Sequence, residues 1–154
     1  PNAVGAFIWA AQQELFDQRK ISRVVPGFVL QPSYTCFDDP RCDIELNGEF
    51  RANNIENDVP FCKGTVAMGG VGMVASGTCF FITLSDEAGQ TLDGRFAAFG
   101  SVIGGWGTVE KIVNAPLRPV ENDMGVAVNE PITPIYLEKV TIETWGRSYP
   151  FERL

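Results

Sequence analysis

Short β-rich segments separated by Gly and Pro constrain the fold of this chain more than any other feature. Residues 23–31, RVVPGFVLQ, form two extended pieces that meet at Pro26-Gly27, a dipeptide typical of turns. Many short strands with Gly-rich turns and few helices predict an all-β barrel. Further strands are expected where β-branched and aromatic residues gather, at 43–46, 48–50, 64–68, 78–84, 97–103 and 135–145.

Two helices are expected to plug this barrel. Apolar residues recur at intervals of three and four from Val4 to Phe16, which predicts one amphipathic helix over about 2–17. A second, shorter helix is expected over 108–114, where Pro116 prevents its continuation. No internal repeat or low-complexity linker divides the 154 residues. We therefore predict a single domain spanning 1–154.

The composition excludes several classes of function. The chain contains no histidine, which excludes Ser-His-Asp and Cys-His nucleophilic catalysis and His-ligated zinc. The four cysteines form no C-x-x-C pair, which argues against a structural zinc site, and we expect neither a metal nor a cofactor. The net charge is −7 and the few basic residues are scattered, which argues against nucleic-acid binding. No apolar run approaches the roughly 18 residues of a membrane span, so no membrane association is expected.

The state of the cysteines depends on whether the protein resides in an oxidising or a reducing compartment. Cys36 and Cys42 flank a short loop and would be bridged in an oxidising environment. We favour four reduced thiols, and with them a cytoplasmic location, because a chain of this size does not depend on disulfides.

One motif suggests a different class of protein. Residues 70–75, GVGMVA, match the G-x-G-x-x-A pattern of dinucleotide-binding proteins, and Asp93 follows about twenty residues later. That pattern binds a pyrophosphate only when a helix follows it. Here 78–83 is expected to be another strand, which leaves no room for a helix. Nucleotide binding is therefore the least favoured hypothesis.

Three motifs resemble those of the cyclophilin-type peptidyl-prolyl cis–trans isomerases. Residues 22–31 resemble the F-H-R-[VI]-[IV]-P-G-F-[MV]-x-Q motif of that family. Residues 77–83 resemble G-S-Q-F-F-I-x, and they begin nine positions beyond Met68, which is the family's spacing. Residues 92–100 resemble L-D-G-x-[HYF]-x-x-F-G. The motifs occur in the family's order, and the resemblance spans essentially the whole chain.

The resemblance implies a fold and an unusual start. The family fold is an eight-stranded antiparallel barrel closed by a helix at each end, with two strands ahead of the first helix. This chain opens at that helix, so the two N-terminal strands are expected to be absent from it. A second chain or a fragment is then expected to supply them, because an exposed barrel edge favours association.

The resemblance also implies a function, the acceleration of X-Pro bond rotation in peptides and unfolded proteins. Arg23 would be the donor to the prolyl nitrogen, Gln31 would position it, and an apolar socket would hold the proline ring. The residues so implied are Arg23, Phe28 and Gln31 for catalysis, and Val29, Gly69, Gly70, Cys79, Phe81, Leu92 and Phe96 for substrate binding.

This chain departs from the family at several of these positions. Cys79 replaces a glutamine, Thr91 a tryptophan and Phe96 a histidine, while Gly70 replaces an asparagine. Because the apolar socket persists while polar groups at its rim have changed, a non-catalytic module that binds proline-containing segments is the alternative hypothesis.

Overall fold

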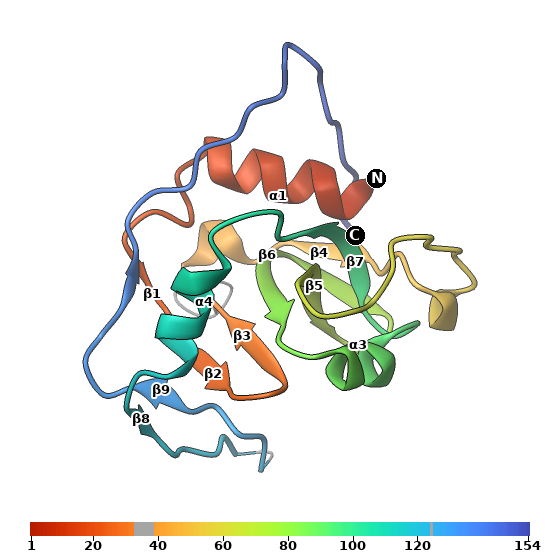
Figure 1. Ribbon diagram of the computed structural model, residues 1–154. Coiled ribbons are helices and arrows are strands. Elements are labelled where there is room, and N and C mark those ends of the chain that lie inside the picture. The colour runs from red at the N-terminus through yellow and green to blue at the C-terminus, as the bar shows by residue number, and fades with distance from the viewer. Residues whose placement is uncertain (33–38, 124) are drawn as a thin grey trace.

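The computed structural model describes residues 1–32, 39–123 and 125–154, and a six-stranded antiparallel sheet lies at its centre. Its strands are β2 (Arg23–Val25), β3 (Val29–Gln31), β4 (Glu45–Asn47), β5 (Thr65–Val71), β6 (Val74–Thr83) and β7 (Ala97–Ser101). Five of them pair in the order β2–β3–β6–β5–β7, and β4 pairs with the first part of β6 (Figure 1). The long β6 therefore connects the two halves of the sheet.

Smaller elements surround this sheet. Two pairs of short strands are formed by β1 (Arg19–Lys20) with β10 (Tyr136–Leu137), and by β8 (Leu117–Arg118) with β9 (Glu130–Pro131). The helices of the described residues are α1 (Asn2–Gln12), α3 (Asp86–Leu92) and α4 (Trp106–Val113), with 3-10 turns η1 (Pro40–Cys42) and η2 (Arg51–Asn53). Among these residues no helix is both long and apolar enough to cross a membrane.

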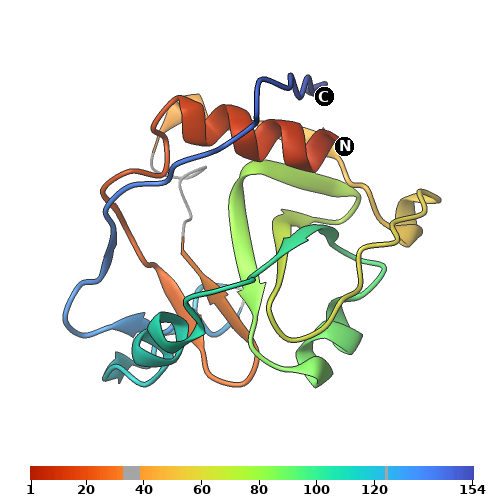
Figure 2. The same ribbon diagram turned by 45° about the horizontal axis from the view of Figure 1, so that its top comes forward.

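Helix α1 lies across one end of the sheet and supplies much of the main core (Figures 1 and 2). It ends before the predicted residue 17, and Glu14 and Gln18 adopt left-handed conformations with φ of 56° and 58°. Leu15 and Phe16 are nevertheless buried as the apolar periodicity predicts. The ring of Phe16 packs against those of Phe7 and Phe80, with centroids 5.2 and 5.3 Å apart.

The predicted barrel and the predicted number of helices are both wrong. The sheet is not closed into a barrel, because within the described residues no strand pairing joins β2 to β7, the two ends of its main strand order. Three α-helices are described instead of two, and the additional one is α3. Ser85 begins that helix, and its hydroxyl accepts a hydrogen bond from Ala88 N–H at 3.0 Å. This capping residue, with the acidic pair that follows it, was the sequence signal for the missed helix.

The predicted strand over 135–145 is present only as β10. Val140 and Ile142 pack against the main core, as the alternation of the sequence predicts. Within the described residues, however, the backbone of 139–143 makes no hydrogen bond to another backbone group, and the Val140 N–H donates instead to Asp17 Oδ1 at 2.8 Å. Beyond it, the C-terminal segment runs over α1, and the rings of Trp9 and Phe151 lie 5.9 Å apart (Figure 2).

The glycine-rich motif lies in a hairpin. Val71 pairs with Val74 across the tip, where Gly72 has a φ of +62°, and β6 follows directly. The strand predicted after this motif is confirmed as part of β6, so the helix that a dinucleotide fingerprint requires does not follow it. The possible Cys36–Cys42 bridge stays a prediction, because Cys36 lies outside the described residues.

Candidate functional site

The β2–β3 hairpin brings Arg23 and Gln31 together. The two residues are direct partners in its register, and Arg23 Nη1 donates to Gln31 Oε1 over 3.4 Å. A shorter bond of 2.7 Å joins Arg23 Nε to the carbonyl oxygen of Ala127. The turn between the strands uses Gly27 at a φ of +75°, a conformation open mainly to glycine. Half-buried Arg23 is thus held at two points, by Gln31 within the hairpin and by the distant Ala127.

Gln31 connects Arg23 to the neighbouring strands. Its side chain is buried, with 6% exposed. A Cβ built on Gly69 would lie 3.3 Å from Gln31 Nε2 and 3.8 Å from the Cβ of Cys79. Gly69 therefore provides the close approach of β5 that Gln31 needs. Arg23, Gln31, Gly69 and Cys79, all predicted for the site, therefore lie side by side, with Gly69 next to both Gln31 and Cys79.

The predicted apolar residues form a cluster beside these four residues. Val29, Phe81 and Leu92 are buried in it, and the half-buried Phe28 and Phe96 pack against it. The rings of Phe81 and Phe96 are perpendicular, with centroids 5.4 Å apart. Side chains two positions apart on a strand share a face, so Val29 and Gln31 extend from the same side of β3, as Cys79 and Phe81 do from β6. This periodicity places the apolar cluster next to Arg23.

Some members of the cluster were not predicted. Phe61 stacks on Phe81 with a centroid separation of 6.4 Å, and Val59, Ala67 and Ala98 also contribute. Phe61 and Val59 lie in a loop without apolar periodicity, so the sequence carried no signal for them. Ala67 lies opposite Phe81 in the register of β5 and β6, which becomes visible only once the strands are paired.

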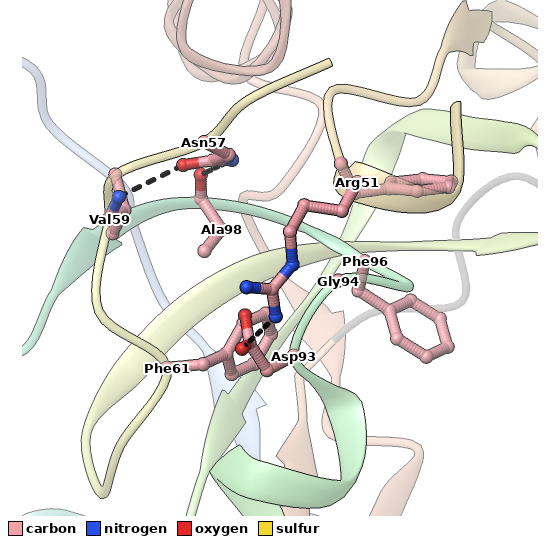
Figure 3. A pocket seen from close by; sticks show the side chains of 9 residues that line it. Arg51, Asn57, Val59, Phe61, Asp93, Gly94, Phe96 and Ala98 are labelled. Carbon is pink, nitrogen blue, oxygen red and sulfur yellow. Dashed lines mark hydrogen bonds and ion pairs between the residues drawn. The ribbon is translucent and has the colours of Figure 1, made fainter. Parts of the chain in front are cut away.

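Two hollows are found near these elements. A cavity of about 10 Å³ lies beside the apolar cluster, between Phe96 and the segment that contains Arg51 and Asn57 (Figure 3). It has room for about one water molecule. A more open depression of about 390 Å³ is lined by Lys63, Gly64, Trp106 and residues 102–104, none of which was predicted for the site. No group of three or more metal-binding side chains occurs within the described residues.

Comparison with known proteins identifies the fold family. The family model described as "Cyclophilin type peptidyl-prolyl cis-trans isomerase/CLD" matches residues 1–142. The chain belongs to this family. Its cyclophilin domain is also similar to a crystal structure of a cyclophilin-type isomerase from Cryptosporidium parvum, with a TM-score of 0.69 and 20% sequence identity. That similarity covers 94% of this chain and 86% of the other, and it supports the cyclophilin-like fold.

Two curated relatives are longer than the region that they share with this chain. Peptidyl-prolyl cis-trans isomerase-like 1 from Homo sapiens is 28% identical over 131 residues, which cover 79% of this chain and 75% of the relative. Peptidyl-prolyl cis-trans isomerase-like 2 from Cryptococcus neoformans is 25% identical over 144 residues, or 92% of this chain. The cyclophilin domain spans only 24% of the length of that second relative.

Gly70, a predicted site residue of this cyclophilin domain, follows Gly69 in β5 and lies towards the tip of the β5–β6 hairpin. It is exposed at the end of β5, where a Cβ would lie 2.0 Å from the carbonyl oxygen of Val74. The backbone of β6 occupies the space that a side chain would need. The glycine at this position therefore follows from the short hairpin.

Proposed function

We propose that this cyclophilin domain accelerates cis–trans rotation of X-Pro bonds in peptides and unfolded proteins. The proposal rests on the guanidinium of Arg23, which Gln31 and Ala127 hold beside an apolar cluster lined by aromatic side chains. A proline ring is apolar, so Phe28 and Phe96, which reach the surface of the cluster, are the groups proposed to receive it. No cofactor or metal is needed, since no covalent bond breaks.

The mechanism follows from the electronic structure of the amide. Rotation faces a barrier of about 18–20 kcal/mol, because the planar form is stabilised by conjugation. Twisting localises a lone pair on the prolyl nitrogen, and a donor aimed at that atom stabilises the twisted form more than either planar form. Arg23 fits this role because it carries five N–H groups and a permanent charge. Its two contacts within the described residues use only two of those groups.

NMR exchange spectroscopy on an Ala-Pro peptide tests this proposal. The structure of the Cryptosporidium relative was determined in the presence of the dipeptide Ala-Pro, which recommends this sequence as a first probe. With catalytic amounts of the protein, we expect cis–trans exchange peaks that are missing from the peptide alone. Peptide shifts without accelerated exchange would favour the non-catalytic binding module. A peptide spectrum that the protein leaves unchanged would contradict both.

We also propose that a second chain or fragment pairs with the open edges of the sheet. Within the described residues β7 is paired on one side only, by β5, and the segment 139–143 makes no hydrogen bond to another backbone group, although Val140 N–H donates to Asp17 Oδ1. Phe99 on β7 and both Val140 and Ile142 pack against the same core cluster. Unpaired edges beside apolar side chains favour the addition of strands.

Native mass spectrometry tests this partner. We expect the purified protein to carry a second polypeptide or to form a multimer, and hydrogen exchange of the 141–143 amides to slow when the partner is bound. The amides of β6, which are already paired, are the internal control. A monomer with the mass of the 154-residue chain alone would contradict the proposal.

A further inference from the structure

A segment outside the predicted site is attached to the turn that leads to Phe96. Arg51, in η2, forms an ion pair with the carboxylate of Asp93 (Figure 3). The next residue, Ala52, donates its N–H to the carbonyl oxygen of Gly94 at 3.0 Å. The start of the turn is thus held by one side-chain contact and one backbone contact.

The far end of the same turn is held by Asn57. Its Nδ2 donates to the carbonyl oxygens of Ala98 and Glu49, each at 2.9 Å, while its Oδ1 accepts from Val59 N–H at 3.1 Å. Phe96 lies two residues after Gly94 and two residues before Ala98. Both attachment points therefore flank the residue that forms a wall of the apolar cluster.

The turn at Gly94 packs closely against the segment that carries Arg51. A Cβ on Gly94 would lie 3.1 Å from Arg51 Nε, so the turn runs directly against the arginine side chain. The cavity between the two has a volume of only about 10 Å³. Phe96, whose ring meets that of Phe81 at right angles, thus lies between two points at which the segment carrying Arg51 and Asn57 is attached.

We infer that Arg51 and Asn57 are positioning residues for the proline socket, acting through the ring of Phe96. This inference rests on the proposed function. Phe96 would contact the proline ring in planar and twisted forms alike, so its displacement weakens both. Loss of the attachment therefore raises KM and the peptide Kd, whereas kcat, which depends on Arg23, changes little.

The ion pair itself contributes little to stability. The side chains of Arg51 and Asp93 are 66% and 44% exposed, and exposed pairs are worth at most about 1 kcal/mol. Arg51→Gln is therefore expected to leave the unfolding midpoint close to that of the parent. An effect on peptide affinity without an effect on stability separates positioning from a general structural role.

Peptide titration by NMR provides the first test. We expect Arg51→Gln to raise the Kd of an Ala-Pro peptide roughly fivefold, Arg51→Lys to recover part of the loss, and Asn57→Ala to act in the same direction. Asp93→Asn combined with Arg51→Gln should be no worse than either alone, since both remove one interaction. Arg118→Gln, which breaks another exposed ion pair with Glu130, is the matched control and should leave Kd unchanged.

The aromatic resonances provide the second test, and they need no peptide. In Arg51→Gln we expect the ring resonances of Phe96 to shift and its cross-peaks to Phe81 to weaken, with Arg118→Gln resembling the parent. The inference is overturned if the Phe96 resonances are unchanged in Arg51→Gln. It is also overturned if the parent binds the peptide and Arg51→Gln binds it with the same Kd. If the parent neither binds the peptide nor accelerates its exchange, the proposed function fails, and the Phe96 resonances still decide whether Arg51 positions that ring.

Discussion

Arg23→Ala is expected to lower kcat/KM for an Ala-Pro peptide by about 10²–10³-fold, which is the usual effect of removing one transition-state donor. The peptide Kd is expected to change far less, because the apolar cluster that receives the proline ring remains intact. NMR exchange spectroscopy measures the rate, and a titration in the same tube measures the affinity. The separation of rate from affinity distinguishes an enzyme from a binding module.

Two further variants sharpen this result. Arg23→Lys keeps the charge but loses the planar fork that reaches both Gln31 and Ala127, so we expect it to recover only a minor part of the rate. Arg118→Ala removes an arginine from β8 and should turn over the peptide as the parent does. If Arg23→Ala exchanges the peptide as fast as the parent, the assignment of Arg23 as the donor is wrong.

The parts of the fold that sequence alone predicted are those encoded by neighbouring residues. The hairpin of 23–31 follows from its own turn, and with it the pairing of Arg23 with Gln31. The alternation along β6 likewise placed Cys79 and Phe81 on one face. The cyclophilin motifs cover these segments, so the fold family and the apolar cluster were both predictable. Their catalytic roles stay predictions until activity is measured.

The parts that sequence alone missed depend on partners far away in the chain. A strand forms only when another strand donates and accepts its backbone hydrogen bonds, and the segment 139–143 has the right alternation without such a partner. Closure of the barrel failed as a prediction for the same reason. The attachment of Asn57 to Ala98 spans 41 residues and leaves no local pattern to detect.

Gly70→Ala is expected to destabilise the domain by about 2–3 kcal/mol, as overpacking against a rigid neighbour does. The added Cβ would lie 2.0 Å from the carbonyl oxygen of Val74 and 2.9 Å from the Cα of Ala75, both of which are backbone atoms. The hairpin of β5 and β6 must therefore shift, and it carries Gly69 beside Gln31. Urea unfolding measures the loss of stability, and peptide titration measures the accompanying loss of affinity.

Gly100→Ala is the matched control, because a Cβ on this strand glycine would meet nothing within 4 Å. It should change the free energy of unfolding by less than about 1 kcal/mol. Equal stability of the two variants would show that the hairpin tolerates a side chain at position 70. The same steric argument applies to Gly70→Asn, which introduces the residue that the family resemblance gives there. That variant is expected to disrupt the hairpin and weaken peptide binding, because the β6 backbone leaves no room for a side chain at position 70 and only the backbone of this residue can face a substrate.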